Sequence, residues 1–255
     1  MKAEIKGSTM PVLEMVLDPG EAVVSDHGEL SWMSTNMQMT QTTASGSSGS
    51  GRGGGLMAGL KRVVGGGSIF LTRYEPTGGA GMVAFAAKLP GHIVAMEVAP
   101  GRGYMVHRHG WLCGTPGIVP TMGFQQSLAG MAFGGEGFVL QRLEGEGTAW
   151  VELSGELTSY DLAAGQGLIV HPGHIGAFQE SVSFQVSRLA GIVNRYAGGD
   201  GHWIVTLTGP GTVWLQSMPL SILAASLRPL LGNGATTDVV AGGAVGGVLG
   251  NILRG

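Results

Sequence analysis

One stretch of the chain can be laid over another without a gap, at a constant offset of 64 residues. Residues 101–153 then fall on residues 165–217, and the match includes glycine turns, a Val-His pair and a tryptophan-containing strand. The motif Gly-Thr-Ala-Trp-Val-Glu at 147–152, for example, falls on Gly-Thr-Val-Trp-Leu-Gln at 211–216. Self-similarity at a fixed period indicates a repeated structural unit, so it constrains the architecture before any motif is considered.

A looser copy precedes these two. Its Pro19-Gly20 turn, its glycine cluster at 65–67 and its strand motif at 81–86 match the second copy at offsets of 81, 69 and 66, which indicates insertions. We therefore expect one all-β domain over residues 1–219, with repeats at about 11–88, 89–163 and 164–219. Each repeat has an apolar face that it cannot bury alone. Stacking the three around a pseudo-threefold axis predicts a β-prism or a short double-stranded β-helix.

The repeats consist of short segments with period-two alternation, separated by glycine-rich turns, which is typical of strands. In each repeat we expect two strands to form a hairpin: 69–74 with 82–88, 138–143 with 147–153, and 202–207 with 212–217. Residues 56–64, 124–133 and 188–197 favour a short helix in each copy. The Ser/Gly-rich stretch 42–55 is expected to be a mobile loop inside the first repeat.

Composition restricts the partners of the chain. Only 12% of its residues are charged, about half of the usual share, which leaves little charge to cover a monomer's surface. We therefore expect self-association. The net charge of -3, without a basic stripe, disfavours nucleic-acid binding. A lone cysteine, Cys113, excludes an intrachain disulfide, and we expect neither a secretory signal nor a spanning helix. These features predict a cytoplasmic protein.

Four histidines are candidate metal ligands. His107 and His109 are two residues apart, and such residues point to the same side of a strand. The spacing is that of the first half of the cupin metal motif, but no glutamate follows; His171 and His174 partly match the second half. Because His107 and His171 occupy the same position in successive repeats, pseudosymmetry places them apart. Turn-flanking, partly exposed histidines are the alternative, and we expect no cofactor.

Two tryptophans are candidates for an interface or for ligand stacking. Trp150 and Trp214 are equivalent in the second and third repeats, and each lies on the strand face opposite the alternating aliphatic residues. Aromatic side chains on such a face stack on a ligand, or cap a core or a subunit interface. The second interpretation is favoured by the thirteen methionines, which add apolar surface suited to protein contact.

The tail over residues 220–255 differs from the repeats. Residues 221–231 are apolar and favour a helix up to Pro229, and residues 241–254 are rich in small side chains. The tail fits a packing arm on a neighbouring subunit, a disordered end, or a segment that touches a membrane surface. Basic residues are nearly absent from it, so anionic lipids would attract it little.

The order of several motifs resembles a known family. They are Gly-Leu-Lys-Arg at 59–62, Phe-Leu-Thr-Arg-Tyr at 70–74, Leu-Pro-Gly-His-Ile at 89–93, Gly-Gly-Glu-Gly-Phe at 134–138, Gly-His at 173–174 and Gly-Pro-Gly-Thr-Val-Trp-Leu-Gln at 209–216. Over about residues 11–219 the chain is similar to the bacterial relatives of the "altered inheritance of mitochondria" proteins, a family of unknown function. The resemblance implies a fold similar to that of the tryptophan RNA-binding attenuation protein (TRAP-like), ring-like assemblies, and no established enzymatic activity or catalytic residues.

These observations favour a non-enzymatic, homo-oligomeric scaffold or interaction protein. By analogy with the mitochondrial relatives, it would be peripheral to a membrane. A small-ligand or nucleic-acid binding module and a cupin-like metal-dependent enzyme are the alternatives. None of these motifs identifies a particular ligand or partner.

Overall fold

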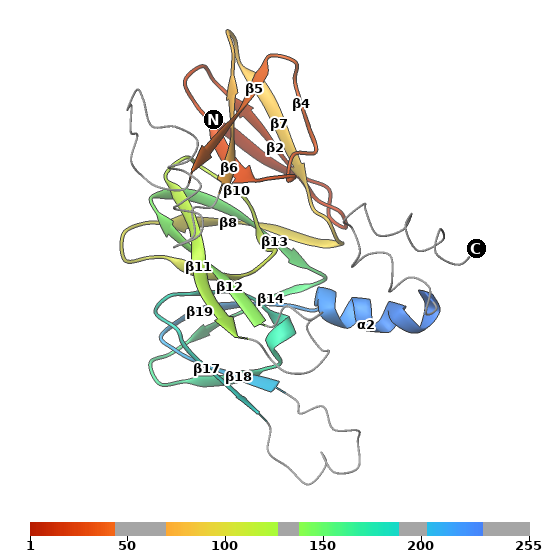
Figure 1. The fold of residues 1–255 in the computed structure, drawn as a ribbon. Helices are drawn as coiled ribbons and strands as arrows, with labels where there is room; N and C mark the ends of the chain where they lie inside the picture. The colour runs from red at the N-terminus through yellow and green to blue at the C-terminus, as the bar shows by residue number, and fades with distance from the viewer. Residues whose placement is uncertain (44–69, 127–137, 189–202, 232–255) are drawn as a thin grey trace, which may run out of the picture.

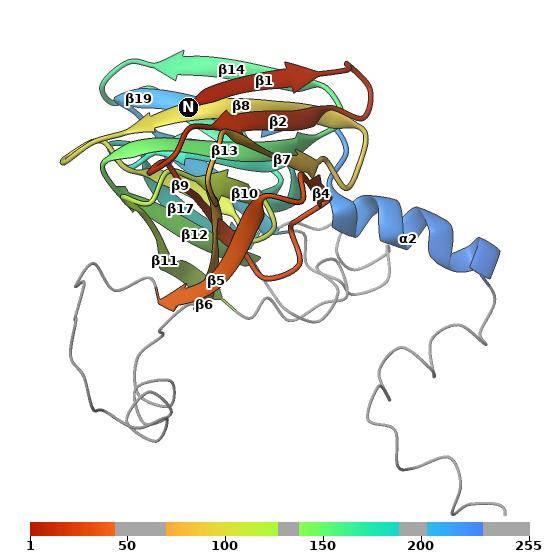
Figure 2. The same cartoon turned by 90° about the horizontal axis from the view of Figure 1, so that it is seen from above.

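The computed structural model describes residues 1–43, 70–126, 138–188 and 203–231. Over these ranges the protein is built almost entirely of antiparallel strands, which confirms the all-β class. Figure 1 shows the chain descending through the molecule, from the N-terminal strands at the top to the strands after residue 157 at the bottom. Figure 2 looks down on the same body from above, with helix α2 projecting from its side.

The described strands form four open sheets, each with two end strands. The four-stranded sheet has the order β1 (Lys2–Lys6), β2 (Val12–Leu17), β7 (Gly81–Ala86), β4 (Trp32–Met33). The first six-stranded sheet has the order β5 (Met37–Thr43), β6 (Phe70–Pro76), β3 (Val23–Asp26), β10 (Trp111–Gly114), β13 (Gly147–Ser154), β8 (Gly91–Val98). The closed prism therefore stays a prediction.

The other two sheets contain most of the later strands. The second six-stranded sheet has the order β11 (Ile118–Gln126), β12 (Phe138–Gly145), β9 (Tyr104–His107), β16 (Ile175–Gln179), β19 (Gly211–Gln216), β14 (Leu157–Leu162). The three-stranded sheet has the order β15 (Gly167–Val170), β18 (Trp203–Thr208), β17 (Ser183–Arg188). A short 3-10 turn, η2 (Pro172–His174), and helix α2 (Leu220–Leu231) complete the described elements.

The three expected hairpins are wrong. β12 and β13 follow one another along the chain, yet β12 pairs with β9 and β11, whereas β13 pairs with β8 and β10. The pairs β6/β7 and β18/β19 are likewise divided between two sheets. Gly145 and Gly147, both at positive φ, flank the step from one sheet to the other. Glycine allows this sharp change of direction because it lacks a Cβ atom.

Strand β13 lies between two cores. Ala149, Val151 and Leu153 point to one face and belong to a buried cluster shared with β3, β9 and β16. Trp150 points to the other face, into a cluster with β2, β4 and β7. Alternate side chains of β13 thus pack into two different apolar clusters, because both faces of the strand are covered. A third cluster lies among the strands of the second six-stranded and three-stranded sheets.

Three local predictions differ from the structure. Residues 124–126 of the stretch 124–133 belong to β11 rather than to a helix, and Arg188 of the stretch 188–197 ends β17. Thr42 and Thr43 of the expected loop 42–55 end β5. The expected helix in the tail is confirmed as α2, but it continues through Pro229 to Leu231. Residues 44–69, with the stretch 56–64, and residues 232–255 lie outside the described ranges, as do residues 127–133 and 189–197.

Candidate functional site

Two buried polar side chains, Glu152 on β13 and Gln216 on β19, mark the candidate site. They lie 64 residues apart and are 7% and 6% exposed. Each accepts a hydrogen bond from a backbone N–H of a preceding segment: Lys88 N donates to Glu152 Oε2 at 3.0 Å, and Ser154 N donates to Gln216 Oε1 at 3.0 Å. Buried carboxylate and amide groups are costly unless they are paired, so these bonds fix both side chains.

Both side chains line a cavity of about 260 Å³. The other lining residues come from the turns after β7 and β9, from the end of β13, and from the first residue of α2: Lys88, Leu89, His107, His109, Ser154 and Leu220. The cavity therefore collects polar groups from segments that are distant in sequence. Helix α2 contributes to its wall through Leu220, so the tail and the body meet at this site.

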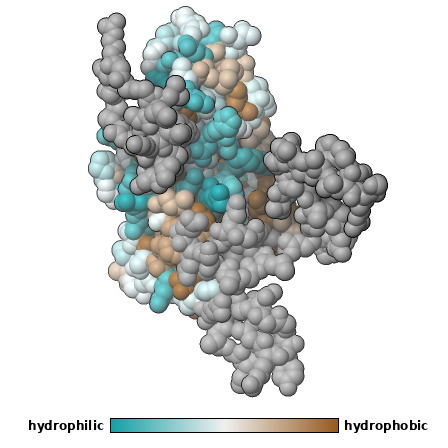
Figure 3. Space-filling view, viewed as in Figure 1, coloured by the Kyte–Doolittle hydropathy of each residue, from teal (hydrophilic) through white to brown (hydrophobic). Residues whose placement is uncertain are grey.

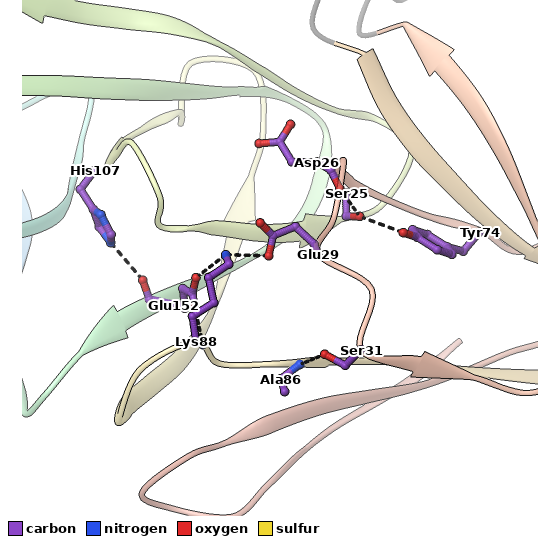
Figure 4. Close-up of polar contacts among 9 residues, drawn as sticks. All are labelled: Ser25, Asp26, Glu29, Ser31, Tyr74, Ala86, Lys88, His107 and Glu152. Carbon is purple, nitrogen blue, oxygen red and sulfur yellow. Dashed lines mark hydrogen bonds and ion pairs between the residues drawn. The ribbon is translucent and has the colours of Figure 1, made fainter. Parts of the chain in front are cut away.

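A charged cluster lies at one end of the cavity. Lys88 Nζ is 2.7 Å from Glu152 Oε1 and 2.7 Å from Glu29 Oε2. Figure 4 shows the two carboxylates approaching the ammonium group from opposite sides. Burial alone would lower the pKa of Lys88, but the hydrogen bonds to Glu152 and Glu29 outweigh it and raise that pKa. Burial raises the pKa of Glu29, although Lys88 partly offsets this.

Asp26 adds a further carboxyl group near this cluster. Burial raises its pKa, and a hydrogen bond with the Gln141 side chain partly offsets the rise. The neighbouring Ser25 is fully buried; its hydroxyl donates to the Asp26 carbonyl at 3.0 Å and lies 3.5 Å from the Tyr74 hydroxyl. Ser25 therefore contacts a phenol and a peptide group.

His107 is a neutral hydrogen-bonding group of the cavity. Its Nε2 lies 3.2 Å from the Glu152 carbonyl oxygen, so the neutral ring with a proton on Nε2 donates to that oxygen. Burial lowers the pKa of His107 to about 4. His109 also lines the cavity, but β9 ends at His107, so His109 lies in the following turn rather than on the expected strand.

His171 and His174 lie in a different place. They line a second hollow of about 320 Å³, together with residues of β14, β15 and β19. His174 Nδ1 is 2.8 Å from the Gln216 carbonyl oxygen, His171 Nδ1 accepts from Gly173 N, and the two rings meet edge-on with centroids 5.8 Å apart. Among the described residues, Gln216 alone lines both hollows. The histidines therefore form two separate pairs.

No three His, Cys, Asp or Glu side chains of the described ranges are grouped so that they could hold a metal ion. Cys113 is fully buried in the first core cluster, where burial raises the pKa of its thiol well above the usual value. It is thus a core residue. The described part of the cavity offers hydrogen-bond donors, a carboxylate and an ammonium group, a set suited to binding a ligand.

The two candidate tryptophans both contribute to packing. Trp150 is 5% exposed and lies in the first core cluster. Trp214 is partly buried and packs edge-on against Tyr104, with ring centroids 5.9 Å apart. Lys88, Glu29 and Ser154 are the site residues that sequence reasoning missed. The usable signal was Glu152, an acidic residue that the offset of 64 aligns with the polar Gln216.

The sheets and the cavity with its buried Glu152 and Gln216 define an open all-β protein with a candidate binding site. Residues 3–218 match the sequence profile of the mitochondrial biogenesis AIM24 family, so the chain belongs to this family. An uncharacterised protein of Streptococcus pyogenes serotype M6 is 27% identical over 222 residues, which are 87% of each chain. The X-ray structure of a Streptococcus pyogenes protein has the same fold, with a TM-score of 0.68 and 23% identity over 90% of this chain and 99% of that chain.

Proposed function

We propose that this chain is a non-enzymatic interaction protein that works as a homo-oligomer. The observation that carries the proposal is the position of its exposed apolar side chains. On six end strands of the four sheets, one large apolar residue is between 43% and 67% exposed: Ile5, Trp32, Met39, Met122, Tyr160 and Ile169. Figure 3 shows apolar patches toward both ends of one face, with a hydrophilic band between them.

Edge strands of monomeric proteins usually carry charges, prolines or bulges that prevent further pairing. Three of these end strands, β4, β5 and β15, contain no charged residue and no proline, and only 12% of all residues are charged. Covering the exposed apolar side chains would remove apolar surface from water, which favours association. Sedimentation velocity at 1–50 µM, about the range in which specific complexes form, tests the proposal. A species larger than the 26.1 kDa monomer is expected, and a monomer throughout this range would overturn it.

The proposal includes an internal architecture of three six-stranded units in a row. The first and last strands of each unit pair with each other, as β2–β7, β8–β13 and β14–β19, and this recurrence supports the three units. Closure around a threefold axis would require β15 of the third unit to pair with β4 of the first. Figure 1 has β4 near the top and β18, the partner of β15, at the bottom, which favours a row.

Contact with a membrane surface is a second candidate function, and helix α2 favours it. Leu220 and Leu227 of α2 are seven residues apart, lie on one face of the helix and are 52% and 43% exposed, and no helix in the described ranges is long and apolar enough to cross a membrane. An apolar helix face of this kind lies in the interface between water and lipid. Cosedimentation with neutral phosphatidylcholine vesicles should be lost in Leu220→Asp/Leu227→Asp. Equal binding by the variant would contradict this role.

A further inference from the structure

The two ends of the row carry half-sheets that have no partner among the described strands. Each six-stranded sheet joins three strands of one unit to three of the next, as β5-β6-β3 with β10-β13-β8 and β11-β12-β9 with β16-β19-β14. The strands left over are β2-β7-β4, extended by β1, and β15-β18-β17. In each six-stranded sheet, one strand pair joins the two units, and we call this pair the join: β3–β10 in the first sheet and β9–β16 in the second. The corresponding free edges at the ends are those of β4 and β15.

We propose that copies of this chain associate head to tail, with β4 of one copy paired antiparallel with β15 of the next. This inference rests on the proposed homo-oligomeric function and names its surface. The pairing would merge the four-stranded and three-stranded sheets into one sheet and would repeat between chains the join that occurs twice within the chain. Pairing between sheet edges supplies backbone hydrogen bonds, and side chains on alternating positions supply specificity.

The internal joins fix the register of the proposed contact. Phe178 lies opposite Met105, and Gly114 lies opposite Val24. The two pairs are related by the sequence offsets of 64 and 81, so they are the same step of the repeat. Continuing the same offsets places Met33 of one copy opposite Ile169 of the next. The register matters because a shift by one residue would turn every side chain to the other face.

At the end of the row, side chains are exposed whose equivalents in the inner unit are buried by a neighbouring unit. Met105 on β9 is 7% exposed, whereas its equivalent Ile169 on β15 is 67% exposed. Met96 on β8 is 2% exposed, whereas its equivalent Tyr160 on β14 is 46% exposed. Tyr160 and Ile169 both line the hollow of about 320 Å³, so this hollow lies at the place where an inner unit is covered by its neighbour.

The opposite end carries a side chain suited to that hollow. At the strand pair next to each join, one partner is a tryptophan: Cys113 faces Trp150, and Ala177 faces Trp214. In the first unit the equivalent pair is Trp32 and Ala84, with the tryptophan on the other strand. Trp150 is 5% exposed, whereas Trp32 is 46% exposed. Trp32 is therefore a packing residue whose neighbouring unit would come from a second copy.

Cysteine cross-linking tests the predicted register. Met33→Cys and Ile169→Cys are prepared separately, mixed and oxidised mildly; the native Cys113 is fully buried and contributes no background. Directly opposed residues on antiparallel strands are within disulfide reach. We expect a mixed disulfide at least tenfold more abundant than in the control mixture of Met33→Cys with Met122→Cys, since Met122 is 64% exposed on a different edge.

A second pair of variants tests the interface without cross-linking. A lysine on an edge strand opposes pairing, so Ile169→Lys should weaken self-association at least tenfold, and Met122→Lys should leave it unchanged. Suppose the protein forms oligomers that Ile169→Lys does not weaken and that yield no excess of the mixed disulfide. This result would overturn the head-to-tail contact but would leave the proposed homo-oligomer in place. A monomer by sedimentation would overturn the proposed function itself. Protection of Ile169→Cys from thiol reagents in a monomer would show that the chain covers its own edge, and would also overturn the contact.

Discussion

The lowered pKa of His107 gives the protein a calculable sensitivity to acid. The group has a pKa of about 4 in the fold, against 6.5 for an ordinary histidine. Because the folded state resists protonation, the unfolded state binds more protons below pH 6.5. Stability from this group is thus present at neutral pH and is lost as the pH falls from about 6.5 to about 4. At pH 5 the loss is about 2 kcal/mol, and it approaches ~3.4 kcal/mol when both states are protonated.

Substituting His107→Gln removes the titration and retains an N–H group that can donate to the Glu152 carbonyl oxygen. Urea unfolding of both proteins at equal concentration, between pH 7.5 and pH 5, gives the two stability curves. The raised pKa values of Asp26 and Glu29 act in the opposite direction, stabilising the fold as the pH falls, but they are common to both proteins. The wild type should therefore lose about 2 kcal/mol more than the variant.

The matched control is His92→Gln, since the side chain of His92 is 41% exposed and its Nε2 lies 3.5 Å from the exposed Glu156 carboxylate. This control should follow the wild-type curve. If His107→Gln runs parallel to the wild type to within about 0.5 kcal/mol, the size of ordinary surface effects, then burial does not hold the imidazole neutral and the account of the cavity is wrong.

Two further predictions concern the packing of the cavity walls. Gly91→Ala would place a Cβ atom 2.0 Å from the Leu153 carbonyl oxygen, so the free energy of unfolding in urea should fall by about 1–3 kcal/mol. The control Gly79→Ala, whose Cβ atom would meet nothing within 4 Å, should change it by no more than about 0.5 kcal/mol. Equal effects of the two variants would contradict the close approach of β8 and β13. Lys88→Met leaves Glu152 and Glu29 without their cation and should cost about 1–2 kcal/mol at pH 8, a value reduced for the half-exposed ammonium group. The cost in urea unfolding should shrink as the pH falls, because burial raises the pKa of Glu29 and a protonated Glu29 does not need the cation. A cost that does not change with pH would argue against the ion pair.

Strand content was predictable because each strand carries its own signal. The alternation around Trp150 located β13, and the glycines at 145 and 147 located the change in direction before it. The partner of that strand was not predictable. A turn residue reports a local backbone conformation, and the same glycines that close a hairpin also carry a chain from one sheet to another. The sequence does not show that both faces of β13 are buried, so it allows the Trp150 face to be interpreted as a ligand surface.

The candidate site was less accessible to sequence reasoning than the strands. The histidines carry visible spacing, but His107 and His171 occupy the same position in two successive units, so the spacing joins residues that line different hollows. Lys88 and Glu29 have no local motif. They meet because β7 and the segment after β3 approach the same end of the cavity, a tertiary effect that no short window contains. The repeat offset aligns Glu152 with Gln216, but nothing local in the sequence marks either residue as part of a site.

The pairing of the first and last strands of each unit has a kinetic consequence. In the first unit Leu17 lies opposite Gly81, so β2 gains this partner only after β7 has been synthesised. Such distant pairings give a high contact order, and chains of this kind fold slowly because long loops must close before their contacts form. Until β7 has been synthesised, the backbone groups on that edge of the apolar strand β2 remain unpaired. The nascent chain should therefore depend on chaperones more than a hairpin-built protein of the same length.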